Sequence, residues 1–306
     1  MIDLLIAAAA ATALPMTAKG PQGPLAGTFL NAGRNSPAVL IIPGSGPTDR
    51  DGNNPLGVTA APYRLLADEL ARKGVSSLRT DKRGLFGSKS AVADANKVTI
   101  SDYASDARQW VSALRQNNEA PCVWVLGHSE GALVALAAAQ QPAGICGLIL
   151  VSGAGRKLSD VIREQLRSNP ANAPVLDPAM AALDALEQGK HVDVSGMHPA
   201  LQKLFAPQVQ DFLIDMFRQD PAKLAASLKV PLLIVQGERD LQVSVADARM
   251  LAAAQPKAKL VLLPRMNHVL KDLDSDDRSA NLATYADPSL PVDPGLVDAI
   301  VRFVER

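Results

Sequence analysis

The fold is decided by the stretch Val-Trp-Val-Leu-Gly-His-Ser-Glu-Gly-Ala-Leu at residues 123–133. It consists of an apolar run, then a serine between two glycines, then helix-forming residues that continue through Ala139. A strand that turns at once into a helix forces the residue at the bend, Ser129, into a strained backbone conformation. Small residues two positions away, Gly127 and Gly131, let the two elements pass each other. The stretch therefore predicts a nucleophile elbow, with the serine hydroxyl above the positive end of the following helix.

Apolar runs alternate with helical patterns along most of the chain, which is typical of a mostly parallel, doubly wound sheet with helices on both faces. The runs expected to be strands are Leu25–Leu30, Ala38–Ile42, Val75–Leu78, Cys122–Leu126, Ile145–Val151, Leu232–Gln236 and Leu260–Leu263. The helices expected between and after them are Pro62–Lys73, Ile100–Leu114, the segment from the elbow to about Gln141, Val243–Ala254 and the segment from Pro294 onward.

About 80 residues separate the strand ending near Val151 from the next one, whereas a plain crossover needs only a dozen or more. We therefore expect a helical cap insertion at residues 155–229, and a core made of residues 21–154 and 230–306. The apolar residues of the insertion either fasten it to the sheet or, in two or three cases, line a pocket over the serine. They are Leu201, Leu204, Phe205, Phe212, Leu213, Met216 and Phe217.

The composition is that of a soluble globular chain, since 47% of the 306 residues are hydrophobic, 20% are charged and the formal net charge is zero. A chain without net charge lacks the basic field that attracts nucleic acid, so no nucleic-acid partner is expected. No apolar run reaches the roughly 18 residues that a membrane span requires.

Residues 1–20 allow two interpretations. Leu4–Leu14 is apolar and rich in alanine, and Ala11-Thr12-Ala13 could serve as a cleavage site, but Asp3 stands where a signal peptide has basic residues. The segment is therefore either a signal peptide or a short N-terminal helix. The protein would be periplasmic or secreted if residues 1–18 are a signal peptide, and cytoplasmic otherwise.

The two cysteines, Cys122 and Cys146, each stand at the start of an apolar run. If the two strands are neighbours, both thiols lie at the same end of the sheet and could be bridged. Two buried free thiols are the favoured interpretation.

A serine hydroxyl needs a base to become a nucleophile, and histidine is the usual one. His128 adjoins the serine, but adjacent side chains diverge at a sharp turn, and His191 and His198 lie in the insertion. His268 follows the last predicted strand and so lies at the carboxyl edge of the sheet, the same edge as Ser129. Open parallel sheets bind ligands at this edge, which makes His268 the candidate base.

The acid that orients the base should leave the same edge. Asp240 directly follows the strand Leu232–Gln236, and Glu238 is the near alternative. With Asp240, the chain has the order Ser129, Asp240, His268, each at the end of a separate strand.

Acyl transfer also requires N–H donors for the developing oxyanion. The backbone N–H of Glu130, at the start of the helix after the serine, is one candidate. The second should come from the loop after the second predicted strand, where Ser45 is the first choice and Gly46 the reserve. Pro43 has no N–H, and Gly44 is expected to make the turn.

Together these motifs resemble the α/β-hydrolase family over nearly the whole chain from Leu25 onward. The chain is most similar to bacterial serine carboxylesterases with a cap after the sixth strand, a group that also includes members similar to serine aminopeptidases. The resemblance implies a triad of Ser129, Asp240 and His268 that uses no metal or cofactor. Its motifs are Pro43-Gly44-Ser45-Gly46, Gly127-His128-Ser129-Glu130-Gly131, Gly237-Glu238-Arg239-Asp240 and Asn267-His268.

Two details go beyond the triad. Pro43 stands where many members have histidine, and the run Thr48-Asp49-Arg50-Asp51-Gly52 resembles that of one esterase subgroup and is expected to buttress its loop.

The sequence thus predicts a serine hydrolase that cleaves small-molecule carboxylic esters of small to medium acyl chain through an acyl-enzyme on Ser129. The alternatives are a serine aminopeptidase or amidase on the same triad, and a low-turnover acyltransferase or ligand-binding protein of the same fold.

Overall fold

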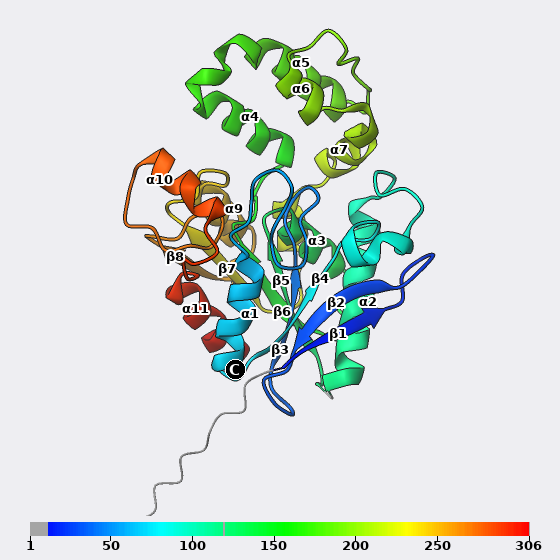
Figure 1. Cartoon of the computed structure of the whole chain (residues 1–306), viewed down its shortest axis with the longest axis vertical. Helices are drawn as coiled ribbons and strands as arrows, with labels where there is room; N and C mark the ends of the chain where they lie inside the picture. Colours follow the sequence, from blue (N-terminus) through cyan, green and yellow to red (C-terminus); the bar gives the residue numbers. More distant parts are fainter. Residues whose placement is uncertain (1–11, 119, 306) are drawn as a thin grey trace, which may run out of the picture.

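A computed structural model describes residues 12–118 and 120–305 of the chain. These residues form an eight-stranded sheet in the order β1-β2-β4-β3-β5-β6-β7-β8 (Figure 1). β2 pairs antiparallel with both β1 and β4, and every other pair of neighbours is parallel. The strands are β1 (Ala13–Ala18), β2 (Leu25–Leu30), β3 (Ala38–Ile42), β4 (Ser76–Thr80), β5 (Val123–His128), β6 (Ile145–Val151), β7 (Leu232–Gly237) and β8 (Lys259–Leu263).

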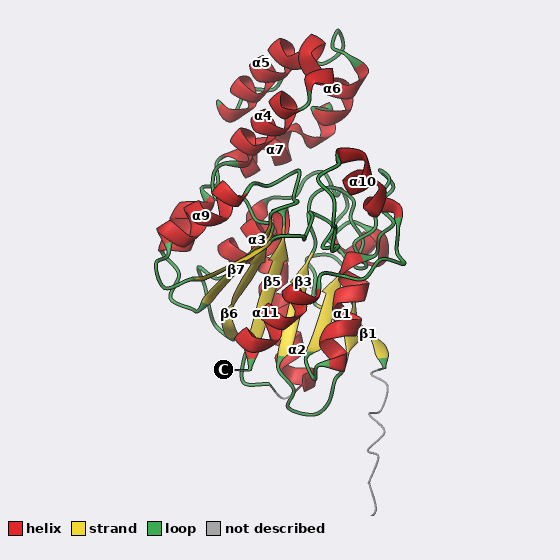
Figure 2. Cartoon of the chain, turned by 90° about the vertical axis from the view of Figure 1, so that its left-hand side faces the viewer, coloured by secondary structure: helices red, strands yellow, loops and turns green. Residues whose placement is uncertain are grey.

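Alternate residues of the central strands face opposite sides of the sheet, and each side has its own core. In β3, Leu40 and Ile42 pack on the side of α2 and α3, whereas Val39 and Ile41 pack on the side of α1 and α11. Because both faces are covered, the central strands are nearly continuous apolar runs, which is why the sequence predicts them well. The covering helices, labelled in Figure 2, are α1 (Pro62–Arg72), α2 (Ile100–Asn118), α3 (Glu130–Ala138), α9 (Val245–Ala254) and α11 (Pro294–Val304).

A set of short helices lies between β6 and β7, and Figure 1 shows α4 to α7 gathered beyond the carboxyl ends of the strands. None of the helices that the structure describes is both long and apolar enough to cross a membrane. The elements of this segment are α4 (Leu158–Ser168), η2 (Pro170–Val175), α5 (Leu176–Glu187), α6 (Pro199–Leu204), η3 (Pro207–Val209), α7 (Gln210–Phe217) and α8 (Pro221–Ala226). The remaining elements are η1 (Phe86–Ala91), α10 (Arg278–Ala283) and η4 (Thr284–Ala286).

The N-terminal segment differs from the sequence prediction. Ala13–Ala18 form the edge strand β1, so the helix interpretation of residues 1–20 is wrong for Ala13–Ala18. A run rich in alanine favours a helix locally, but pairing along the whole of β2 gives this segment a ladder of backbone hydrogen bonds instead. Residues 1–11 lie outside the described residues, and the signal-peptide interpretation remains a prediction.

Cys122 and Cys146 form a disulfide, with their Cα atoms 5.1 Å apart, so the prediction of two free thiols is wrong. The strands that follow or contain them, β5 and β6, are neighbours, and Val123 pairs with Ile145. The bridge therefore joins the amino ends of two central strands, at the edge of the sheet opposite to Ser129.

Replacing both cysteines by alanine is expected to lower the free energy of unfolding by about 2–4 kcal/mol, because the bridge restricts the unfolded chain over a sequence separation of 24. Urea unfolding of the parent and the double variant measures the difference. A thiol reductant should bring the parent close to the variant and leave the variant unchanged. Equal stability of the two oxidised proteins would contradict the expectation.

Candidate active site

Ser129 lies at the bend between β5 and α3, with φ 55° and ψ −119°. Residues other than glycine rarely adopt this positive φ. The backbone strain is tolerated because the neighbouring elements fix the bend. The two flanking glycines are required by close packing. A Cβ atom on Gly127 would lie 2.1 Å from the carbonyl oxygen of Gly131, and one on Gly131 would lie 2.4 Å from that of Ile42.

His268 and Asp240 are in direct contact. The Nδ1 atom of His268 lies 3.0 Å from Oδ1 and 2.9 Å from Oδ2 of Asp240, and both side chains are buried. Since Nδ1 faces the carboxylate, Nε2 is the ring atom that can act on the pocket, which His268 and Ser129 both line. Glu238, the alternative acid, has an exposed side chain. The structure thus brings together the three residues chosen from the sequence.

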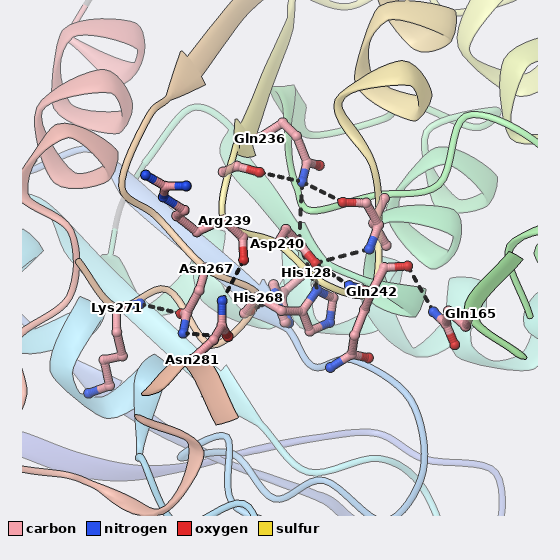
Figure 3. A network of polar contacts seen from close by, with 12 residues as sticks. His128, Gln165, Gln236, Arg239, Asp240, Gln242, Asn267, His268, Lys271 and Asn281 are labelled. Atoms are coloured by element: carbon pink, nitrogen blue, oxygen red, sulfur yellow. Dashed lines mark hydrogen bonds and ion pairs between the residues drawn. The ribbon is translucent and has the colours of Figure 1, made fainter. Parts of the chain in front are cut away.

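The carboxylate of Asp240 is surrounded by donors (Figure 3). Oδ1 accepts the backbone N–H groups of Gln242 at 2.8 Å and Val243 at 2.9 Å, and Oδ2 accepts Nε2 of Gln236 at 3.2 Å. Burial alone would raise the pKa of Asp240. The electrostatic attraction and hydrogen bond of His268, together with the two backbone N–H groups, bring the pKa below its usual range. Asp240 is therefore ionised and fixed in place.

A buried hydrogen-bonded chain connects three segments of the site. Nε2 of His128 lies 2.9 Å from the backbone carbonyl of His268, and Nδ1 lies 2.7 Å from the hydroxyl of Tyr63. A carbonyl only accepts, so Nε2 of His128 carries the proton and the Tyr63 hydroxyl donates to Nδ1. The Tyr63 oxygen in turn accepts the N–H of Gly44 at 2.9 Å. Both ring nitrogens of His128 are thus hydrogen-bonded, so His128 cannot serve as the base for Ser129.

A second network fixes the loops that carry Asp240 and His268 (Figure 3). Nδ2 of Asn267 donates to Oγ1 of Thr284 at 2.7 Å and lies 3.3 Å from Oδ1 of Asn281. Nδ2 of Asn281 donates at 2.7 Å to the carbonyl of Arg239, the residue before Asp240. The network therefore joins the residue before His268 to the residue before Asp240 through α10.

Three of these supporting residues, Gln236, Tyr63 and Asn281, were missed in the sequence. The sequence did contain an indication of the role of Gln236, because this is the polar residue at the end of an otherwise apolar buried strand. Tyr63 and Asn281 gave none, since a tyrosine on an amphipathic helix and an asparagine in a polar segment are ordinary. The other two histidines have local roles, because His191 pairs with Asp211 on the surface and the His198 side chain caps α6.

The candidate oxyanion donors lie on the two segments around Ser129. The Glu130 N–H belongs to the first residue of α3. On the other side, Gly44 packs against the serine, since a Cβ atom there would lie 3.2 Å from Cβ of Ser129. The Gly44 N–H is already donated to Tyr63, which leaves Ser45 and Gly46, both exposed, as the next N–H groups of the loop.

The pocket at Ser129 has a volume of about 100 Å³. Among its described lining residues there is no aspartate, glutamate, lysine or arginine, and none comes from the helices between β6 and β7. The apolar residues of those helices, such as Phe205 and Phe217, are buried in the core instead. The described part of the chain also contains no cluster of three histidine, cysteine or acidic side chains suited to a metal ion. The lining residues are Gly44, Ser45, Thr48, Gly52, Asn54, Val58, Pro62, Tyr63, His128, Ser129, Gln242, His268, Val269 and Tyr285.

Solved esterase structures share this fold. The esterase Pf2001 of Pyrococcus furiosus has a TM-score of 0.59 and 16% identity, and the match covers 97% of this chain and 93% of that one. A thermophilic esterase of Thermogutta terrifontis has a TM-score of 0.57 and 19% identity, with 96% and 98% covered. At these identities the likeness establishes the α/β-hydrolase fold alone.

Sequence comparison also identifies the family. Esterase EstD of Thermotoga maritima is 28% identical over 277 residues, which are 88% of this chain and 62% of that protein, so the chain spans about three fifths of its relative's length. The family model described as "Serine aminopeptidase, S33" matches residues 56–274, well over half of the chain. The chain therefore belongs to the serine aminopeptidase S33 family of α/β-hydrolases.

Proposed function

We propose that the protein is a carboxylesterase-type serine hydrolase that cleaves small-molecule esters through an acyl-enzyme on Ser129. The main support for this proposal is the arrangement of three side chains. His268 is held by Asp240 through Nδ1, and it lines the same pocket as Ser129 on its strained elbow. The relative from Thermotoga maritima, named as an esterase, supports the same activity.

In the proposed reaction, Nε2 of His268 takes the Ser129 proton while the serine oxygen attacks the ester carbonyl carbon. Asp240 keeps the proton of Nδ1 in place and stabilises the imidazolium that forms. The tetrahedral intermediate collapses, and His268 gives its proton to the departing alcohol oxygen. A water molecule then repeats the two steps on the acyl-enzyme and releases the acid.

The negative charge of the tetrahedral intermediate requires N–H donors, and we assign the Glu130 N–H and the Ser45 N–H to this role, with Gly46 in reserve. The engagement of the Gly44 N–H by Tyr63 supports the choice of a later residue in the loop. Losing one such donor typically lowers turnover by about 10²–10³.

The lining of the pocket favours an ester over a peptide with a free amino terminus. An aminopeptidase needs a carboxylate to bind the substrate's ammonium group, and the described lining residues include none. An ammonium buried without a partner is costly, because it loses its hydration. The volume of about 100 Å³ suits a small group on one side of the ester bond. The family description favours the aminopeptidase as the second candidate, on the same three residues.

Ser129→Ala should lower kcat/KM for short p-nitrophenyl esters by at least about 10⁴, because the acyl-enzyme cannot form. Steady-state kinetics on the purified variant measures this, with circular dichroism as the check on folding. Activity retained by the variant would refute the role of Ser129. Labelling of Ser129 by a fluorophosphonate without ester turnover would favour the low-turnover acyltransferase or ligand-binding alternative.

Kinetic comparison separates the ester and aminopeptidase candidates. We expect kcat/KM for p-nitrophenyl acetate to exceed that for alanyl p-nitroanilide by at least about 10², because the ammonium group would have no charged partner in the pocket. N-acetyl-alanyl p-nitroanilide is the matched control, since it keeps the amide and removes the charge. Faster turnover of the free amine than of both other substrates would establish the aminopeptidase.

Nδ1 of His128 accepts the Tyr63 hydroxyl only while the imidazole is neutral, which makes the stability of the fold depend on pH. Burial and the neighbouring His268 lower the pKa of His128 to about 3, against about 6.5 in the unfolded chain. The folded form stays neutral while the unfolded form binds a proton. This contribution to stability is therefore fully present above the unfolded pKa and is lost as the pH falls toward the folded pKa.

His128→Gln removes this titration. The parent should be more stable than the variant at pH 6, and the difference should shrink by about 2–3 kcal/mol at pH 4. Urea unfolding of both proteins at pH 6, 5 and 4 measures it. A difference that stays constant over this range would mean that His128 is not held neutral.

A further inference from the structure

A buried ion pair lies beside the elbow, outside the three residues of the proposed triad. Nζ of Lys82 is 2.8 Å from Oε1 of Glu130, and their side chains are only 7% and 2% exposed. Lys82 follows β4, and Glu130 is the first residue of α3. Removing two charges from water is costly, and apolar residues of similar size often serve stability as well or better. The position of the pair therefore calls for a functional explanation.

The Lys82 ammonium also reaches the other side of the site. Nζ donates to the carbonyl of Gly46 at 3.3 Å and lies 5.5 Å from the centre of the Tyr103 ring. Thr48 fixes the same turn, because its N–H donates to Gly46 and its hydroxyl to the Ser45 carbonyl. Lys82 thus contacts both segments that carry the proposed oxyanion donors.

The charge of Glu130 explains why an ammonium is needed there. Its carboxylate belongs to the same residue as the N–H that we assign to the oxyanion, and buried like charges repel strongly. The charge of Glu130 acts on Tyr63, a residue that lines the pocket. Burial raises the pKa of the Tyr63 phenol well above its ordinary value, and the charge of Glu130 raises it further. An unpaired Glu130 would therefore oppose the charge that develops during the reaction.

We propose that Lys82 is a positioning residue of the oxyanion site, which joins the Ser45–Gly46 turn to the start of α3 and cancels the charge of Glu130. This role rests on the proposed hydrolase function. Lys82 does not contact the reacting atoms. It keeps two N–H groups from different segments in register, and it makes the field around them favourable to an anion.

Substitutions of Lys82 and Glu130 should then lower kcat unequally. An ion pair with a purely structural role would not cause this difference. Lys82→Met leaves a buried negative charge beside the oxyanion and frees the turn, and should lower kcat by roughly 10–10² with little change in KM. Glu130→Gln leaves the ammonium in place and should lower kcat less than Lys82→Met does, because no unpaired carboxylate remains beside the oxyanion. The double variant Lys82→Met/Glu130→Gln should recover the part of the loss that the unpaired carboxylate causes and keep the part that the freed turn causes.

Two measurements are made on each variant: kcat and KM for a p-nitrophenyl ester, and the Ki of a trifluoromethyl ketone. The concentration of active sites, needed for kcat, is determined by titration with a fluorophosphonate. The ketone forms an anionic adduct with a serine, so its Ki should rise in Lys82→Met in parallel with the fall in kcat/KM. Lys82→Gln gives the same test if the methionine variant does not fold. Asp106→Asn is the matched control, since it breaks the buried Arg83–Asp106 pair next to Lys82, lowers stability and keeps kcat within about threefold.

Each outcome decides between the alternatives. Unchanged kcat and Ki in Lys82→Met would overturn the role of Lys82, and so would equal losses in both single variants without recovery in the double variant. An inactive parent protein, with no labelling of Ser129, would instead overturn the hydrolase function on which the role depends.

Discussion

The steric constraint at the elbow determines the rest of the site. β5 can turn directly into α3 only because Gly127 and Gly131 leave room for the backbone atoms that pass them, and Gly131 also lets α3 approach the end of β3. A strained residue such as Ser129 costs about 1–3 kcal/mol. α3 offsets this cost, because nearly all of its residues are buried. The close approach places both sides of the proposed oxyanion site within reach of one serine.

Buried polar contacts then fix the loops around that bend. The chain from Gly44 through Tyr63 and His128 to the His268 carbonyl joins the loop after β3, the elbow and the loop that carries His268. Every donor in it has an acceptor, so its burial carries little penalty, and the loss of one member would leave another unpaired. Such a chain holds loops in one geometry, which hydrophobic packing alone does less well. The site is therefore preorganised by Tyr63 and His128, which have no direct role in the proposed reaction.

The sequence predicts those features that have a local cause. Central strands read as apolar runs because both faces are buried, and Ser129, Asp240 and His268 follow strand ends that a parallel sheet brings to one edge. The disulfide was missed because it depends on the order and register of two strands, which no local pattern encodes. β1 was missed because an edge strand needs no continuous apolar run. Supporting residues such as Tyr63 acquire their role only through contacts that are distant in sequence.

The pocket takes its shape from loops of the core, and ion pairs beneath the sheet edge hold them. Asp51 pairs with Arg79 and Arg50 pairs with Asp81, so the loop that supplies the pocket residues from Thr48 to Val58 is anchored to β4. The helices between β6 and β7 contribute no described lining residue, yet Gln165 of α4 donates to the carbonyl of Gln242, which borders the pocket and also binds Asp240. In the proposed reaction, these loops would border the group next to the ester bond. The contact of Gln165 with Gln242 is one route by which the intervening helices could affect the proposed reaction.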